Sequence, residues 1–97
     1  MKSLKEIKKI LSSHKNEFKE NYSVKEIGVF GSYVKNKNKK KSDIDILVEF
    51  DKPVDFFLYL ELEERLSKIL KVKVDLVMKK ALKPGIGKFI LQEVVYV

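Results

Sequence analysis

Asp43 and Asp45 carry the clearest chemical signal in this chain. They flank Ile44 at the start of an apolar run, Ile44 to Phe50, that predicts a strand. Because side chains alternate between the two faces of a strand, both aspartates point the same way. Adjacent carboxylates repel each other, and their oxygens suit Mg²⁺, which takes further ligands from water and substrate phosphates. The pair therefore indicates a divalent cation site.

A site for phosphate is expected just upstream. Gly31-Ser32 follows an apolar run, Ile27 to Phe30, that ends a predicted strand over Val24 to Phe30. We expect Ser32 to cap a short helix over Ser32 to Lys35, and Gly31 to let a ligand approach the backbone closely. The N–H groups at such a helix start would bind phosphate.

A third carboxylate stands within a later apolar run. Val72 to Met78 predicts a strand in which Asp75 shares a face with Lys73 and Val77. An aspartate among apolar residues is costly to bury without a partner. If this strand neighbours the one at Ile44 to Phe50, three carboxylates converge. The phosphate site, the carboxylates and the lysine-rich loop at Lys35–Lys41 together indicate nucleoside triphosphate chemistry.

The pattern resembles the nucleotidyltransferase motif of the DNA polymerase beta superfamily. More narrowly, the chain is similar to the minimal nucleotidyltransferase (MNT) proteins, small prokaryotic antitoxins encoded beside a HEPN-domain toxin. The resemblance runs from about Ile27 to the C-terminus and rests on these segments: Gly31-Ser32, Ser42-Asp43-Ile44-Asp45, Lys73-Val74-Asp75-Leu76-Val77 and Ala81-Leu82-Lys83-Pro84. It implies an α/β (α+β) fold, a small mixed β-sheet flanked by helices, and a single minimal nucleotidyltransferase domain over residues 1–97.

The resemblance also implies roles for individual residues. Asp43 and Asp45 would bind two Mg²⁺ ions, and Asp75 would bind one of them and could accept the proton of the acceptor hydroxyl. The β- and γ-phosphates of ATP would be held by Gly31, Ser32 and Lys35. In the family, Ala-Arg-Gly often follows the Gly-Ser-x segment, whereas this chain has Val34, Lys35 and Asn36. Lysine lacks the bidentate geometry of arginine, while asparagine tolerates the left-handed backbone that glycine supplies.

The remaining elements form the support for this site. We expect one amphipathic helix from Met1 to about Tyr22, in which His14 is structural, a long helix from Asp55 to Leu70, a connector at Lys79–Lys83, a short helix from Pro84 to Glu93 and a docked apolar end at Val94–Val97. The long helix has more apolar surface than one stripe needs, because it also carries Phe56, Phe57 and Tyr59. We favour core packing for these three side chains over an oligomerisation face.

Composition limits the class of protein. Ninety-seven residues with 44% hydrophobic content suit one domain with a modest core, and the absence of cysteine excludes disulfides and thiolate metal sites. No apolar run is long enough for a bilayer span and no signal peptide is visible, so we expect a cytoplasmic protein. The net charge of +7 favours polyanionic partners, or simply solubility. The Lys35–Lys41 loop is either a solvated connection or a cationic surface beside the phosphates or for an acidic partner.

The function implied by the resemblance is a Mg-dependent protein adenylyltransferase. It would transfer AMP from ATP to a hydroxyl, expected to be a tyrosine, of a HEPN toxin, and so act as the antitoxin. Three alternatives stay open: a non-catalytic antitoxin that neutralises by binding, a small-molecule (antibiotic) nucleotidyltransferase, and a nucleic-acid-binding module using the lysine-rich loop. The last is the least expected. Homo- or hetero-oligomers are both compatible with the sequence.

Overall fold

Within the described residues, four strands form a mixed sheet in the order β3-β2-β1-β4. The structure, a computed structural model, describes residues 2–37 and 42–97; our expectations for residues 38–41 of the lysine-rich loop lie outside them. The elements are α1 (Leu4–Ser13), α2 (Lys15–Tyr22), β1 (Val24–Phe30), η1 (Gly31–Tyr33), β2 (Ile44–Phe50), α3 (Phe56–Leu70), β3 (Val74–Met78), η2 (Lys79–Ala81), α4 (Pro84–Glu93) and β4 (Val95–Tyr96), where η marks a 3-10 helix.

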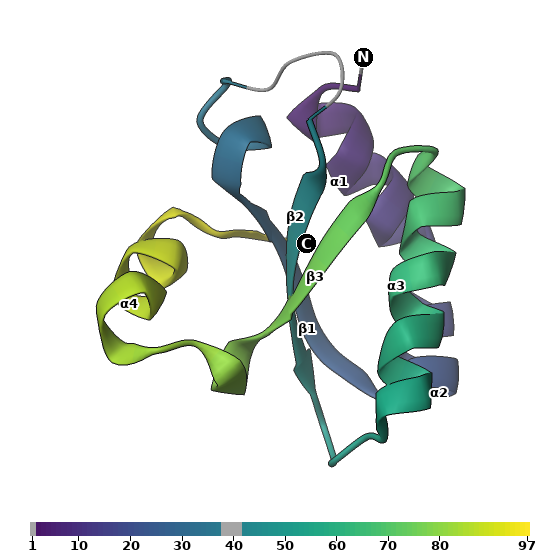
Figure 1. The fold of residues 1–97 in the computed structure, drawn as a ribbon. Helices are drawn as coiled ribbons and strands as arrows, with labels where there is room; N and C mark the ends of the chain where they lie inside the picture. Colours follow the sequence, from purple (N-terminus) through teal and green to yellow (C-terminus); the bar gives the residue numbers. More distant parts are fainter. Residues whose placement is uncertain (1, 38–41) are drawn as a thin grey trace.

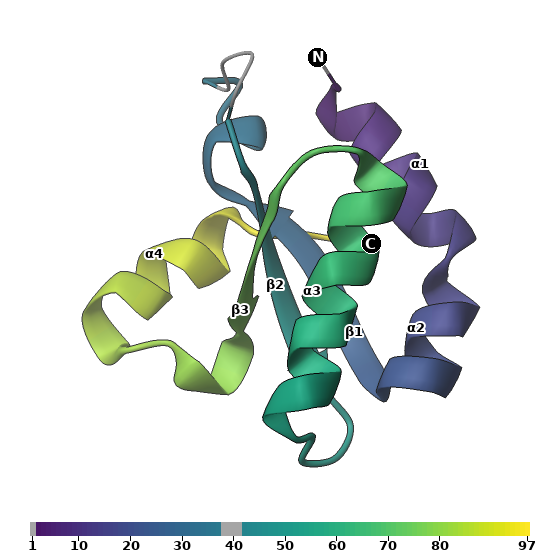
Figure 2. The same ribbon diagram turned by 45° about the vertical axis from the view of Figure 1, so that its right-hand side comes forward.

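The sheet separates two unequal layers. β1 is antiparallel to both β2 and β4, whereas β2 and β3 are parallel. Helices α1, α2 and α3 cover one face of the sheet, and α4 lies on the other side (Figures 1 and 2). The mixed α/β fold predicted from the sequence is therefore confirmed.

The core lies between the sheet and the helices α1 to α3. Every second residue of a strand points into this core and packs against the apolar stripe of a helix, as expected for a sheet with one covered face. Its most deeply buried members are Ile7, Leu11, Phe18, Ile27, Val29, Ile44, Ile46, Val48, Leu62, Leu66 and Leu70. Asp45 lies between Ile44 and Ile46 in sequence, so its side chain is directed to the opposite face, where α4 lies.

The long helix α3 follows from its sequence. Its N-cap is Asp55, whose carboxylate accepts a hydrogen bond of 2.8 Å from the Leu58 N–H. Leu62, Leu66 and Leu70 recur every four residues and are fully buried. The predicted helix is confirmed, with Asp55 as its cap rather than its first residue.

Side chains of α3 also fix the edge strand β3, which carries Asp75. The Ser67 hydroxyl accepts a hydrogen bond of 3.0 Å from the Val74 N–H, and Glu63 accepts one of 3.1 Å from the Leu76 N–H. An edge strand otherwise exposes such donors. The long helix therefore helps to hold Asp75 in place.

The N-terminal segment differs from the single helix that we expected. It breaks at His14, which has φ −110° and ψ 10° between α1 and α2. The Ser13 hydroxyl donates to the Ile10 carbonyl at 2.7 Å, and a ring nitrogen of His14 lies 2.9 Å from the same oxygen. Side chains that compete in this way for backbone carbonyls weaken a helix. The structural role predicted for His14 is confirmed.

The preferred interpretation of the aromatic residues at the start of α3 is wrong in part. Phe56 and Phe57 are 67% and 75% exposed, because they lie on the far side of α3 from its leucine stripe. Tyr59 does pack against the core, and its hydroxyl donates to the Leu76 carbonyl.

The end of the chain is docked, as expected. β4 pairs with β1 through Gly28 opposite Tyr96 and Val29 opposite Val95, and the Val97 N–H donates to the Ile27 carbonyl at 3.0 Å. Among the described residues, no helix combines the length and apolar character needed to cross a membrane.

Because the leucine stripe of α3 is buried, replacing a leucine within it should destabilise the protein more than replacing one outside it. Leu66→Ala removes a fully buried side chain and should lower the free energy of unfolding by about 2–5 kcal/mol. Leu60→Ala, at a position 39% exposed, should cost clearly less. Urea unfolding followed by circular dichroism measures both, and equal losses would contradict the assigned core.

Candidate active site

The predicted carboxylates meet where β1 ends and β2 and β3 begin. In the sheet register, Asp45 pairs with Phe30 of β1 on one side and with Asp75 of β3 on the other. Paired residues of neighbouring strands point to the same face, so Asp45 and Asp75 both lie on the face opposite the helical layer. Asp43 directly precedes β2 and follows the same alternation. The expectation that the third strand neighbours the second is confirmed.

The three carboxylates differ in their environment. Asp45 is half-buried, whereas Asp43 and Asp75 are exposed. Partial burial, followed by the negative charges of Asp75, Asp43 and Glu93, raises the pKa of Asp45 from 3.8 to about 6. Burial is thus the larger cause of the raised pKa, and the three neighbouring carboxylates add to it.

Among the described residues, one ion pair joins a lysine to these three carboxylates. Lys73 Nζ lies 4.0 Å from Asp43 Oδ2, and both side chains are largely exposed, which makes this a weak pair. Within residues 2–37 and 42–97, no three acidic or histidine side chains stand close enough together to hold a metal ion as placed. A cation site here therefore needs the exposed side chains to turn toward Asp45.

Gly31 is required at its position. It has a backbone φ of +79°, which residues other than glycine rarely adopt, and a Cβ built on it would overlap Asp45 Oδ2. The close approach predicted for this glycine is thus real, but the neighbour in contact is the central carboxylate. The backbone of Gly31 and the side chain of Asp45 form one continuous surface.

The turn after Gly31 differs in detail from our expectation. Its three-residue 3-10 helix begins after Phe30, with no side-chain cap, so Ser32 is the second residue of the turn and does not cap it. The tight turn uses backbone acceptors instead, since the Val34 and Lys35 N–H groups both donate to the Gly31 carbonyl. Asn36 has φ +56°, so the left-handed conformation allowed for it is confirmed. The Tyr33 hydroxyl donates to the Ser42 carbonyl at 3.3 Å and holds the turn against the start of β2.

Glu93 was missed by the sequence analysis. It is the last residue of α4, and its Oε1 accepts a hydrogen bond of 3.0 Å from the Gly31 N–H. Its Oε2 lies 3.1 Å from Lys35 Nζ. No local motif marks Glu93, because it stands 62 residues after Gly31 and reaches the site only through the packing of α4 and β4.

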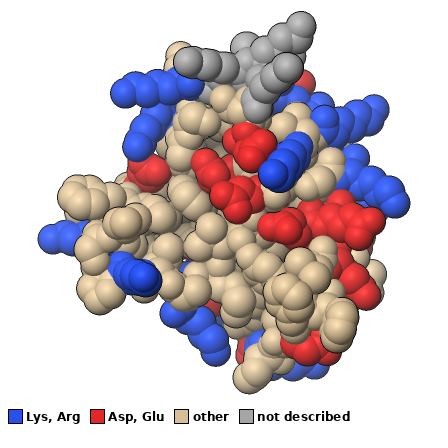
Figure 3. All heavy atoms as spheres, in the orientation of Figure 1, with Lys and Arg blue, Asp and Glu red and all other residues tan. Residues whose placement is uncertain are grey.

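Charged side chains gather on this face of the molecule. Figure 3 shows acidic groups near its middle, over the sheet and beside α3, with basic groups around the edge. The arrangement suits a ligand that combines cations with phosphates, since acidic groups bind the former and lysines attract the latter.

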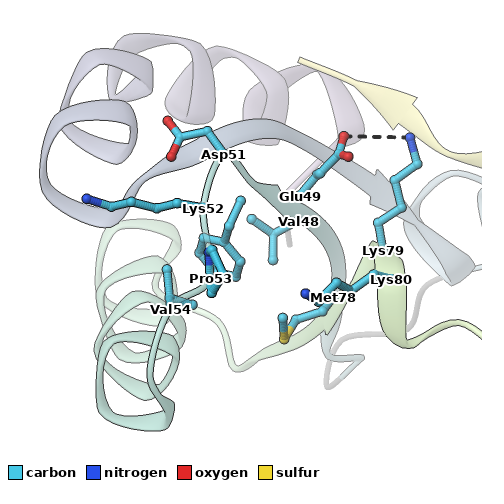
Figure 4. Close-up of a pocket in the computed structure, with 10 residues that line it drawn as sticks. Val48, Glu49, Asp51, Lys52, Pro53, Val54, Met78, Lys79 and Lys80 are labelled. Carbon is cyan, nitrogen blue, oxygen red and sulfur yellow. Dashed lines mark ion pairs between the residues drawn. The ribbon is translucent and has the colours of Figure 1, made fainter.

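A separate pocket of about 320 Å³ lies at the other end of β2 and β3, between segments 48–54 and 78–80. Glu49 and Lys79 form an ion pair of 3.8 Å at its edge (Figure 4), and Lys79 makes a second one with Glu26. None of the predicted site residues lines this pocket. Its ion pairs join three segments of the fold, and we assign the candidate site to the carboxylates instead.

Known proteins are similar to this chain over most of its length. The family model described as "Nucleotidyltransferase domain" matches residues 11–97. The chain is 53% identical over its whole length, and over 98% of the relative, to the protein adenylyltransferase MntA of Thermococcus cleftensis. Among solved structures, a toxin–antitoxin complex with AMP-PNP is similar with a TM-score of 0.73 and 24% identity, over 93% of this chain and 70% of the other. A complex of the tri-AMPylated HEPN toxin of Shewanella oneidensis with its MNT antitoxin gives a TM-score of 0.67 and 22% identity, with the same coverage.

The contact between Gly31 and Asp45 makes a prediction about the backbone. Gly31→Ala should destabilise the protein by about 1–2 kcal/mol through the left-handed conformation alone, and it should also displace the Asp45 carboxylate. Gly85→Ala is the matched control, since a Cβ there meets nothing within 4 Å. Thermal unfolding and amide NMR spectra compare the two; an Asp45 resonance that stays unchanged in Gly31→Ala would contradict the contact.

The second prediction concerns the titration of Asp45. Its carboxyl carbon, followed by ¹³C NMR, should titrate near pH 6. Asp75→Asn should lower this pKa but leave it above 3.8, because burial is the larger cause. Since the pKa of Asp45 is higher in the folded state, its contribution to stability is complete below pH 3.8 and is lost as the pH rises through 6. A midpoint near 3.8 in the wild-type protein would refute the proposed crowding.

Proposed function

The chain belongs to the nucleotidyltransferase domain family, together with the protein adenylyltransferases that it resembles over its full length, and from this membership we propose that it transfers AMP from ATP to a hydroxyl group of a partner protein. Residues 1–97 act in this proposal as a single minimal nucleotidyltransferase domain. In this proposal the reaction takes place in the cytoplasm, where ATP is available.

One observation carries the proposal: the register that sets Asp45 beside Asp75 on the same face, next to the Gly31 backbone. Nucleotidyl transfer needs aligned reactants and neutralised charge more than covalent participation by the protein. Carboxylates beside a group of phosphate-binding donors meet that need. A site used only for protein binding would not require three aspartates on one face.

The donor set fits Mg²⁺. Asp43, Asp45 and Asp75 offer the hard oxygen ligands that this ion prefers, and a cation would offset both causes of the raised pKa of Asp45, its burial and the negative charges around it. We assign two Mg²⁺ ions to Asp43 and Asp45, with Asp75 as a further ligand of one. When bound, two such ions would supply the positive charge that an in-line displacement needs at its attacking and leaving oxygens.

The protein's own groups then have distinct tasks. The Gly31 N–H, the Ser32 hydroxyl and Lys35 hold the β- and γ-phosphates, which leaves the α-phosphorus facing the acceptor. The acceptor oxygen forms a bond to this phosphorus, the bond to the β-phosphate oxygen breaks, and pyrophosphate leaves. Asp75 takes the proton of the acceptor hydroxyl; its exposure at the edge strand leaves it accessible to a second protein.

The acceptor in this proposal is a HEPN toxin, modified on a tyrosine hydroxyl, so that the chain acts as an antitoxin. Support comes from one solved complex, in which an MNT antitoxin accompanies a tri-AMPylated HEPN toxin. A transferred AMP group carries negative charge, and beside the site of an RNA-cleaving toxin it would repel the RNA substrate.

The proposal is tested by transfer itself. The purified chain is mixed with Mg²⁺, each NTP in turn and the product of the adjacent gene, and intact masses are recorded. We expect the partner to gain AMP units from ATP, and Asp45→Asn to slow the transfer by at least about 10²-fold, because it removes charge that stabilises the transition state. Asp51→Asn, an exposed aspartate at the other end of β2, is the matched control and should transfer normally.

Three results would contradict the proposal. Full transfer by Asp45→Asn would remove the carboxylates from the mechanism. A stable complex with the partner but no mass gain from any NTP would show an antitoxin that acts by binding. Nucleotide transfer to an aminoglycoside without a protein acceptor would show a small-molecule enzyme.

A further inference from the structure

The Glu93 carboxylate binds the two donors, the Gly31 N–H and Lys35, that the proposed function assigns to phosphate. The Gly31 N–H donates to Glu93 Oε1 at 3.0 Å, and Lys35 Nζ lies 3.1 Å from Glu93 Oε2. Both Glu93 oxygens are thus engaged, each by a different donor. A carboxylate and a phosphate compete for such donors, because both are anions with several acceptor oxygens.

Glu93 has both repulsive and attractive neighbours. Its negative charge is one of those that raise the pKa of Asp45, so it faces like charges on one side. On the other side it gains the Gly31 N–H and Lys35. The Glu93 side chain is 21% exposed and that of Lys35 is 54% exposed, so the contact is shielded from water mainly on the side of Glu93.

We propose that Glu93 is an internal competitor for the triphosphate, which must leave Gly31 and Lys35 before nucleotide phosphates bind there. The inference rests on the proposed function and adds to it a residue that sets nucleotide affinity. Glu93 is a positioning residue, since it acts through Gly31 and Lys35 and not on the reacting atoms.

The exchange requires a movement of the side chain and not of the whole helix. Glu93 ends α4, and the Val94 N–H still bonds to the Ile90 carbonyl at 2.9 Å. Directly afterwards, Val95 and Tyr96 pair with β1. The backbone at Glu93 is therefore tethered to the sheet, whereas the glutamate side chain has several rotatable bonds with which to turn toward solvent.

The exchange also predicts that the site discriminates between a single weak anion and a triphosphate with its Mg²⁺. With Glu93 in place, a single weak anion gains little, because it must displace a carboxylate already paired with Lys35. A triphosphate accompanied by Mg²⁺ replaces that carboxylate with more negative oxygens and neutralises the neighbouring aspartates at the same time. The contact thus favours the complete metal–nucleotide ligand over free phosphate.

The test uses Glu93→Gln in the full chain. Its side chain can still accept a hydrogen bond from Gly31, but it no longer carries the charge that holds Lys35. We expect tripolyphosphate without Mg²⁺ to bind about tenfold more tightly than to the wild-type protein, and Mg·ATP to gain by a smaller factor, in isothermal titration calorimetry at fixed salt; charge-assisted hydrogen bonds support a change of this size. Glu49→Gln, which removes another lysine-paired carboxylate away from the site, is the matched control and should leave both affinities unchanged.

Equal or weaker binding of tripolyphosphate by Glu93→Gln would overturn the proposal. Should that variant not fold, the wild-type protein decides: on addition of tripolyphosphate, the ¹³C resonance of the Glu93 carboxyl and the amide resonance of Gly31 should shift together. A Gly31 shift without one at Glu93 would also refute the exchange. These measurements do not depend on nucleotide transfer, so a chain that transfers no AMP would refute the proposed function while the role of Glu93 is still decided by tripolyphosphate.

Discussion

The parallel register of β2 and β3 is the constraint on which the rest of this structure depends. It is set by the buried face of the two strands, where Ile44 and Ile46 lie opposite Val74 and Leu76. A slip of one residue would turn these apolar side chains outward and bring the aspartates into the core, at high cost. Hydrophobic packing on one face therefore forces the carboxylates together on the other, although they repel each other.

The rest of the site balances that repulsion. Asp45 sits against Gly31, whose missing Cβ leaves room for it, and Lys35 brings positive charge that is shared with Glu93. The resulting site holds its own anion on the donors proposed for phosphate. Cation and nucleotide binding would then relieve two unfavourable features at once, the crowding of the aspartates and the placement of Glu93 among them.

The distribution of layers separates stability from function. Helices α1 to α3 and the inner face of the sheet form the core, and α3 also fixes the edge strand through Ser67 and Glu63. The outer face carries the carboxylates, and α4 lies beside it with Ile86 and Phe89 each 70% exposed. A rigid inner layer can hold the carboxylates in place while the outer face stays accessible to a ligand and a protein acceptor.

Local residue patterns determined much of this protein without reference to its fold. Apolar runs predicted the strands β1 and β2 to the residue, and alternation set Asp43 and Asp45 on one side, since the period of a strand is a local property. The glycine at position 31 and the left-handed turn at Asn36 were likewise readable, because backbone conformation depends on the residue itself. The resemblance to the minimal nucleotidyltransferases depended on the same short motifs.

Tertiary structure alone decided the relations between distant segments. Pairing of β3 with β2 brought Asp75 beside Asp45, and the return of the chain through α4 and β4 placed Glu93 on Gly31 and Lys35. The exposure of Phe56 and Phe57 was also settled only there, because it depends on which side of α3 packs against the core. Such contacts arise from how packed faces meet, and a one-dimensional pattern does not contain the direction from which another segment arrives.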